Sequence, residues 1–288
     1  MDTCQQIERS IITKFRKPIW GGFMHSLTEY RLIQPGDHVA ACISGGKDSF
    51  LMAKCLQEVQ RHGNVPFQLS FLVMDPGYHP RNRQLIEENA KLLNLPIHIF
   101  ETDIFDAVAS MDHNPCYICA RMRRGYLYKN ARLLGANKIA LGHHYDDVIE
   151  TILLNMFYGG EMKTMMPRLR SQNYPGMELI RPLYKVREKD VIAWKQYNRL
   201  TFLNCACRFT ENSEPGGGGK RAEVKALIAQ LSQNNPLVES NIFRSCHDVN
   251  LKTVIGYIQD GIHHPYDEAW NGSETRLTDS AEGMDDEG

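Results

Sequence analysis

The stretch from Val39 to Lys54, V-A-A-C-I-S-G-G-K-D-S-F-L-M-A-K, restricts the possible folds of this 288-residue chain more than any other. It opens with an apolar run that predicts a buried strand, passes through a polar glycine turn, and then places apolar residues at helical spacing. A strand that leads through a tight turn into a helix directs backbone N–H groups at a bound anion. The stretch therefore predicts an α/β fold with a phosphate-binding turn.

The turn has the sequence S-G-G-K-D-S, in which the two glycines allow close approach to a phosphate, the lysine adds positive charge and the serines add donors. A Walker P-loop differs, because it requires G-x-x-x-x-G-K-[ST]. The turn resembles instead the pyrophosphatase loop of the ATP-pyrophosphatase superfamily, whose members split ATP into AMP and pyrophosphate to adenylate a carbonyl oxygen. The nucleotide-binding candidates in this turn are Ser44, Gly45, Gly46, Lys47, Asp48 and Ser49.

Further apolar runs alternate with helical patterns after this turn. Strands are predicted at 67–74, 97–100 and 138–141, with a helix at 82–93 between the first two. This βαβαβ order indicates a doubly wound, mostly parallel sheet, in which ligands bind beyond the carboxyl ends of the strands. The superfamily resemblance implies an adenine nucleotide alpha hydrolase-like, Rossmann-like fold, with Met74 beside the adenine.

A second informative stretch, P-C-Y-I-C-A-R-M-R-R-G-Y-L-Y at 115–128, contains the pair Cys116 and Cys119. The C-x-x-C spacing suits zinc, an iron–sulfur cluster or redox chemistry, and on its own it does not distinguish them. Three arginines follow at once, and positive charge of this kind lowers a thiol pKa or pairs with tRNA phosphates.

A third stretch, G-H-H-Y-D-D, follows the strand predicted at 138–141 and supplies Gly142, His143, Asp146 and Asp147. Paired carboxylates at a strand end suit a magnesium ion on ATP phosphates, since Mg²⁺ prefers one or two carboxylates together with phosphate oxygens. Asp is also common as a helix N-cap, so this stretch alone is weak evidence for a metal site. Its occurrence together with the glycine turn strengthens that prediction.

Charge and composition limit the protein class. The net charge is −1, yet residues 267–288 hold eight acids and one base, so residues 1–266 carry +6, which permits RNA binding. No apolar run is long enough to span a membrane, and the N-terminus lacks an apolar signal core. We therefore expect a cytoplasmic protein without disulfides, in which Cys42 and Cys55 are buried apolar residues.

The chain divides into four expected parts. Residues 1–34 are expected to be helical, with Ile7, Ile11, Ile12 and Phe15 on one face, and 35–200 to form the ATP-pyrophosphatase domain. Within that domain, 158–170 is expected to be a mobile basic loop. Residues 201–266 are expected to form a cysteine-bearing helical extension, and 267–288 an acidic disordered tail.

The combined motifs resemble the tRNA 2-thiocytidine synthetases, iron–sulfur-dependent tRNA thiolases that replace the 2-oxygen of cytidine-32. The resemblance runs from about residue 10 to residue 250. It is carried by the glycine turn, the stretches at 115–128 and 139–147, L-N-M-F-Y-G-G at 154–160 and I-R-P-L-Y-K-V-R-E-K-D at 180–190. It implies tRNA as substrate, with ATP, Mg²⁺ and a [4Fe–4S] cluster as cofactors.

The resemblance also implies roles for individual residues. Lys47 and Asp48 would act in adenylation, and Cys116 and Cys119 in sulfur transfer. These two cysteines and Cys205 would hold the cluster. The family commonly repeats C-x-x-C at the later place, whereas this chain has C-A-C, so Cys207 competes with Cys205. Sulfide delivery at an open iron and a persulfide on a cysteine both remain open as routes.

Other readings of the motifs remain. The target base could differ from cytidine, or the chain could be a zinc-stapled RNA-binding protein without catalysis. A small-molecule ATP pyrophosphatase is a third alternative, although the cysteines have no role there. Expected partners are tRNA and a cysteine desulfurase or other sulfide donor, with no membrane and a possible homodimer.

Overall fold

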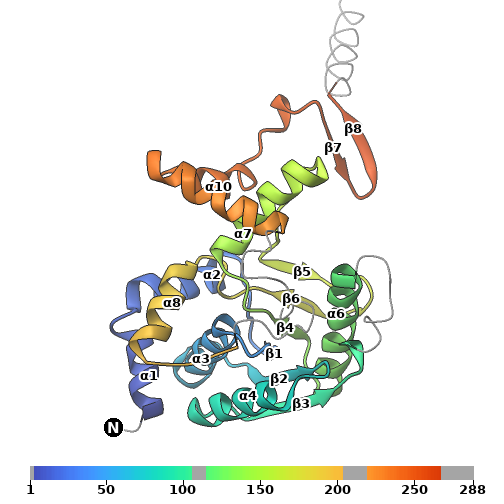
Figure 1. The fold of residues 1–288 in the computed structure, drawn as a ribbon. Helices are drawn as coiled ribbons and strands as arrows, with labels where there is room; N and C mark the ends of the chain where they lie inside the picture. The colour runs from blue at the N-terminus through green and yellow to red at the C-terminus, as the bar shows by residue number, and fades with distance from the viewer. Residues whose placement is uncertain (1–2, 106–114, 204–218, 267–288) are drawn as a thin grey trace, which may run out of the picture.

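The computed structural model describes residues 3–105, 115–203 and 219–266 and has a six-stranded sheet at its centre (Figure 1). The strand order is β3-β2-β1-β4-β6-β5, and every neighbouring pair is parallel except β5 and β6. The predicted doubly wound, mostly parallel sheet is thereby confirmed. The strands of this sheet are β1 (His38–Ile43), β2 (Gln68–Asp75), β3 (Ile97–Glu101), β4 (Lys138–Ala140), β5 (Arg168–Arg170) and β6 (Glu178–Ile180).

Helices cover both faces of the sheet (Figure 1). Further helices precede its first strand and follow its last strand in the chain. Between the N-terminus and β4 they are α1 (Thr3–Ile12), the π-helix η1 (Arg16–Gly21), α2 (Gly22–Glu29), α3 (Lys47–His62), α4 (Pro80–Leu92) and α6 (Pro115–Leu133). After β4 they are α7 (Tyr145–Leu154), the π-helix η2 (Asn155–Gly159), α8 (Glu188–Tyr197), α10 (Lys220–Asn234), α11 (Val238–Ser245) and the short η3 (Leu251–Thr253).

The central strand β1 is buried on both faces, as a strand of a doubly wound sheet must be. Its alternate residues Val39, Ala41 and Ile43 join the larger core, which lies against α3. The intervening Ala40 and Cys42 join a second core that contains α6 residues. This period of two explains why the predicted strand has no polar positions.

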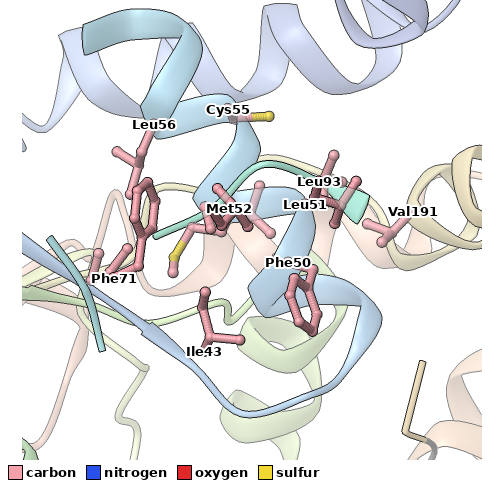
Figure 2. Packing of buried hydrophobic residues seen from close by; sticks show 14 of the residues in the cluster. Ile43, Phe50, Leu51, Met52, Cys55, Leu56, Phe71, Leu93 and Val191 are labelled. Atoms are coloured by element: carbon pink, nitrogen blue, oxygen red, sulfur yellow. The ribbon is translucent and has the colours of Figure 1, made fainter. Parts of the chain in front are cut away.

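Helix α3 fixes the turn that precedes it by packing into the larger core. Figure 2 shows Phe50, Leu51 and Met52 from its first turns among side chains of the sheet and of neighbouring helices. Phe50 also stacks on Phe202, with ring centroids 5.2 Å apart. Cys55 is fully buried in the same core, and Cys42 is buried in the other, as the sequence predicted.

The N-terminal helices belong to the larger core. Ile7, Ile11 and Phe15 are buried in it, as predicted. The prediction was wrong for Ile12, which is 39% exposed. One residue advances a helix by about 100°, so two adjacent isoleucines cannot both face the core.

This difference between neighbours provides a stability test. Ile11→Ala should lower the free energy of unfolding by about 2–5 kcal/mol, because Ile11 is 0% exposed and the cavity left behind adds to the lost burial. Ile12→Ala is the matched control and should cost about 0.5 kcal/mol. Equal costs, measured by denaturant unfolding, would contradict this packing of α1.

The prediction for 158–170 was wrong at its end, where Arg168–Arg170 form the antiparallel edge strand β5. Arg168 is held there by two hydrogen bonds to Glu178, at 2.7 and 2.9 Å.

The predicted C-terminal extension contains α10 and α11, and also a hairpin of β7 (Gly256–Gln259) and β8 (Ile262–Pro265) that was not foreseen. The predicted acidic tail, 267–288, lies outside the described residues.

No helix within the described ranges combines the length and the apolar character that crossing a membrane requires.

Candidate active site

A cavity of about 560 Å³ opens at the carboxyl ends of β1, β2, β4 and β6. This edge includes the point where the chain order reverses, between β1 and β4, which is where open α/β sheets bind ligands. Predicted site residues from three separate stretches line it: Ser44, Asp48, Ser49, Met74, Gly142, His143 and Asp147. These stretches therefore converge at one cavity.

The glycine turn is closed by its two serines. The Ser44 backbone N–H donates to Ser49 Oγ at 3.1 Å, and Ser49 Oγ donates to the Gly46 carbonyl at 2.9 Å. Gly45 has a φ of +90°, and a Cβ there would lie 2.6 Å from Leu203 Cδ1. The turn therefore requires glycine at this position and presents the first turn of α3 to the cavity.

Gly142 permits the close approach of the β4 end to α3. A Cβ at this position would lie 2.9 Å from the Ser49 backbone nitrogen and 3.0 Å from the Asp48 carbonyl carbon. Both contacts are with backbone, so no side-chain rotation relieves them. Gly142 thus sets the width of the cavity between the glycine turn and the end of β4.

We expect Gly142→Ala to weaken ATP binding about tenfold or more. Overpacking of this kind costs about 1–3 kcal/mol, and 1.4 kcal/mol is a factor of ten in affinity. Gly125→Ala is the control, since its Cβ would meet only Tyr174 Oη at 3.9 Å. Isothermal titration with a non-hydrolysable ATP analogue measures both, and an unchanged dissociation constant for Gly142→Ala would show that the loop and β4 adjust freely.

Lys47 lies outside the lining of this cavity. Its Nζ is 3.1 Å from both Asp48 Oδ2 and Glu188 Oε1, and it borders a neighbouring cavity of about 340 Å³. Burial alone would lower the pKa of Lys47, but the two carboxylates outweigh burial and raise it. Lys225 and Lys47 in turn lower the pKa of Glu188 to about 2, although burial opposes this. Both groups are therefore charged at neutral pH.

The two adjacent acids of the third stretch, Asp146 and Asp147, make different contacts. Asp147 lines the cavity, and its Oδ2 accepts the His144 backbone N–H at 3.0 Å in a capping box of α7. Asp146 accepts the Glu188 backbone N–H at 2.6 Å and pairs with Arg187 at 3.1 Å. Asp146 thus ties α7 to the start of α8, and of the two acids only Asp147 lines the cavity.

Two polar atoms beside the cavity are buried without a hydrogen-bond partner in the described part of the chain, Asp48 Oδ1 and His143 Nδ1. Burial, together with the nearby Arg181 cation, lowers the pKa of His143 to about 4. His143 is therefore a neutral imidazole at pH 7, and Asp48 keeps a carboxylate oxygen available for a ligand.

The predicted cysteine site falls mostly outside the described residues. Cys116 and Cys119 lie in the first two turns of α6, but their side chains are not among those described, and Cys205 and Cys207 lie in the undescribed range 204–218. In the described part of the chain no three His, Cys, Asp or Glu side chains form a metal-ligating group. The chain leaves the described region beside the glycine turn, where the Leu203 N–H donates to the Gly45 carbonyl at 3.1 Å.

Sequence reasoning missed three charged residues that hold this site together: Arg187, Glu188 and Arg221. Arg221 from α10 reaches Asp147 at 3.1 Å and Glu150 at 2.8 Å, so it fixes α10 on α7. Two of the three lie in the stretch 180–190, which the resemblance had marked without a role. For these two residues, that stretch was the only signal in the sequence.

Comparison with known proteins identifies the family to which this chain belongs. A family model described as a PP-loop domain matches residues 23–208. The tRNA-cytidine(32) 2-sulfurtransferase of Citrifermentans bemidjiense is 36% identical over 229 residues, which cover 78% of this chain and 88% of that protein. The protein of the same name from Photobacterium profundum is 35% identical over 241 residues, covering 82% of this chain and 78% of the relative.

A solved structure shares the fold over most of its length. The U34-tRNA thiolase NcsA from Methanococcus maripaludis, determined with its [4Fe-4S] cluster, superposes with a TM-score of 0.63 at 20% identity. The superposition covers 88% of this chain and 82% of that one.

Proposed function

Because this chain belongs to the PP-loop family of tRNA-cytidine(32) 2-sulfurtransferases, we propose that it replaces the 2-oxygen of cytidine-32 in tRNA with sulfur at the expense of ATP. The observation that carries the proposal is the single cavity in which the glycine turn, Asp48, Asp147 and the end of β4 meet. Such a cavity holds ATP phosphates at one wall and leaves room for a second reactant.

The chemistry requires an activated leaving group, because the C2 carbonyl oxygen of cytidine leaves poorly on its own. Attack of this oxygen on the α-phosphorus of ATP forms a C2–O–AMP linkage and releases pyrophosphate. A sulfide sulfur then bonds to C2, and AMP leaves with the former carbonyl oxygen. Atoms and electrons balance with sulfide as the sulfur source. The backbone N–H groups at the α3 N-terminus stabilise the charge on the departing pyrophosphate.

The residues on the cavity wall fit a magnesium ion on the ATP phosphates. Asp48 Oδ1 is buried and lacks a hydrogen bond within the described residues, and Asp147 lies on the same wall. Asp146, named with Asp147 in the sequence prediction, does not line this cavity. We therefore assign the magnesium-binding role to Asp48 and Asp147, where the ion would neutralise phosphate charge.

For the [4Fe–4S] cluster we propose Cys116, Cys119 and Cys205 as ligands. Cys116 and Cys119 are three residues apart in the sequence of α6, the C-x-x-C spacing that cluster ligands have. Leu203, two positions before Cys205 in the sequence, donates its N–H to the Gly45 carbonyl in the glycine turn. A cluster held by these three cysteines would supply a site for sulfide.

The predicted partners follow from the same reaction. A cysteine desulfurase or another sulfide donor would supply the sulfur, and a homodimeric state remains a prediction. Deleting the gene from its host should remove 2-thiocytidine from the tRNA nucleosides, and a plasmid copy should restore it. Persistence of 2-thiocytidine with loss of another thiolated nucleoside, read by mass spectrometry, would assign a different target base.

A further inference from the structure

Arg181 is a buried cation that has no acidic partner among the described residues. It follows β6 directly, at the carboxyl edge of the sheet, and is only 9% exposed. Its Nη1 donates to the Met166 carbonyl, while its Nε is buried without a hydrogen-bond partner among the described residues. No carboxylate within the described ranges forms an ion pair with it. A buried charge left in this state is costly unless a ligand compensates it.

Arg181 is charged at neutral pH, but the described residues around it do not neutralise this charge. Burial lowers the pKa of Arg181 to about 10, so the guanidinium is still a cation at neutral pH. Asp147, an acid that lines the same cavity, is already bound by Arg221 and by the His144 backbone N–H. The other neighbours, Tyr128 and Tyr184, are neutral phenols.

Two further arginines line the same cavity from α6, Arg123 and Arg124. Neither forms an ion pair within the part of the chain that the structure describes. The two carboxylates on the wall, Asp48 and Asp147, lie beside the glycine turn and at the start of α7. The cavity thus has an excess of positive charge on the wall that β6 and α6 form.

This cationic wall is separate from the glycine turn. The strand order places β6 two positions from β1, a lateral distance of about 10 Å, with the end of β4 between them. The turn already supplies the backbone donors that ATP phosphates require. A second reactant must lie beside the ATP, and the base of a polynucleotide brings its own phosphodiester when it is flipped into a pocket.

We propose that Arg181, together with Arg123 and Arg124, forms a second phosphate-binding subsite in the cavity, which takes the backbone phosphate of the reacting tRNA nucleotide. The guanidinium suits this ligand, because its planar fork binds two phosphate oxygens at once. The inference rests on the proposed function, since it assigns the ligand as tRNA. In this role, Arg181 would position the substrate base against ATP.

The test compares Arg181→Gln and Arg181→Lys with the wild-type protein. Dissociation constants are measured for unmodified tRNA at several salt concentrations and for a non-hydrolysable ATP analogue, together with the melting temperature. Arg170→Gln is the control, because it removes an arginine from the exposed edge strand β5, outside this cavity.

We expect Arg181→Gln to weaken tRNA binding about tenfold and to reduce the slope of log affinity against log salt by about one, the signature of one lost phosphate contact. ATP affinity should stay within twofold, and Arg181→Lys should restore part of the tRNA affinity at an unchanged melting temperature. A purely structural role would lower the melting temperature without this change in salt slope.

Two results would overturn the inference. Loss of ATP affinity with normal tRNA affinity would assign Arg181 to the nucleotide phosphates, and unchanged affinities in both variants would mean that no phosphate binds there. If Arg181→Gln does not fold, Arg181→Lys decides by the same two affinities. A wild-type protein that thiolates no tRNA contradicts the proposed function itself, whereas an active wild type with normal Arg181 variants contradicts only this inference.

Discussion

Lys47→Ala is expected to lower the rate of tRNA thiolation by about 10²-fold or more, the scale for losing one preorganised electrostatic contact to a developing charge. Lys47 begins α3, where it is the cation of the glycine turn. In this structure its Nζ rests between Asp48 and Glu188. Binding of ATP should exchange one of these carboxylates for phosphate oxygens, so the lysine acts as pyrophosphate departs.

The measurement is the single-turnover rate of AMP and pyrophosphate formation in the presence of tRNA. Lys195→Ala is the matched control, since Lys195 borders the same smaller cavity as Lys47 but lies on α8. It should retain most of the wild-type rate. A Lys47→Ala variant with the wild-type rate would exclude Lys47 from catalysis.

The second large effect concerns the later cysteines. Cys205→Ser should abolish both iron binding and thiolation, while Cys207→Ser should keep most of each. The wild-type protein, purified without oxygen, should hold about four irons per chain. The two cysteines are only two positions apart, so sequence spacing alone does not separate them. Similarity to the family at the preceding R-E-K-D helix favours Cys205.

Iron content and thiolated-nucleoside yield of the two variants decide this assignment. An active Cys205 variant beside an inactive Cys207 variant would reverse it. Two inactive variants would favour a closed site with four cysteine ligands and hence a persulfide route. Zinc in place of iron after anaerobic reconstitution would rule out the cluster altogether.

The sheet and the glycine turn were predictable because their signals are local. The apolar run of β1 and the two glycines after it lie within a few residues, and the turn geometry depends on Gly45 itself. The strand predicted at 67–74 differs from β2 by one residue at each end. Parallel pairing then follows from the order of elements, which brings distant strand ends to one edge.

The different roles of Asp146 and Asp147 were not predictable, because they depend on contacts with residues more than forty positions away in the sequence. Asp146 and Asp147 are equivalent in the sequence, yet Arg187 and the Glu188 N–H bind only the first. Arg181 is a similar case, since only the assembled strands show that no described carboxylate pairs with it. Sequence motifs locate the cavity, and tertiary contacts decide which of its charges are available.

The most direct test of the account uses two tRNA transcripts that differ only at position 32, one with cytidine and one with uridine. Anaerobically reconstituted protein is incubated with each in the presence of ATP, Mg²⁺ and sulfide, and nucleosides and nucleotides are quantified. The account predicts 2-thiocytidine from the first transcript only, with one AMP and one pyrophosphate formed for each sulfur inserted. Thiolation of the uridine transcript alone, or ATP split to ADP and phosphate, would contradict it.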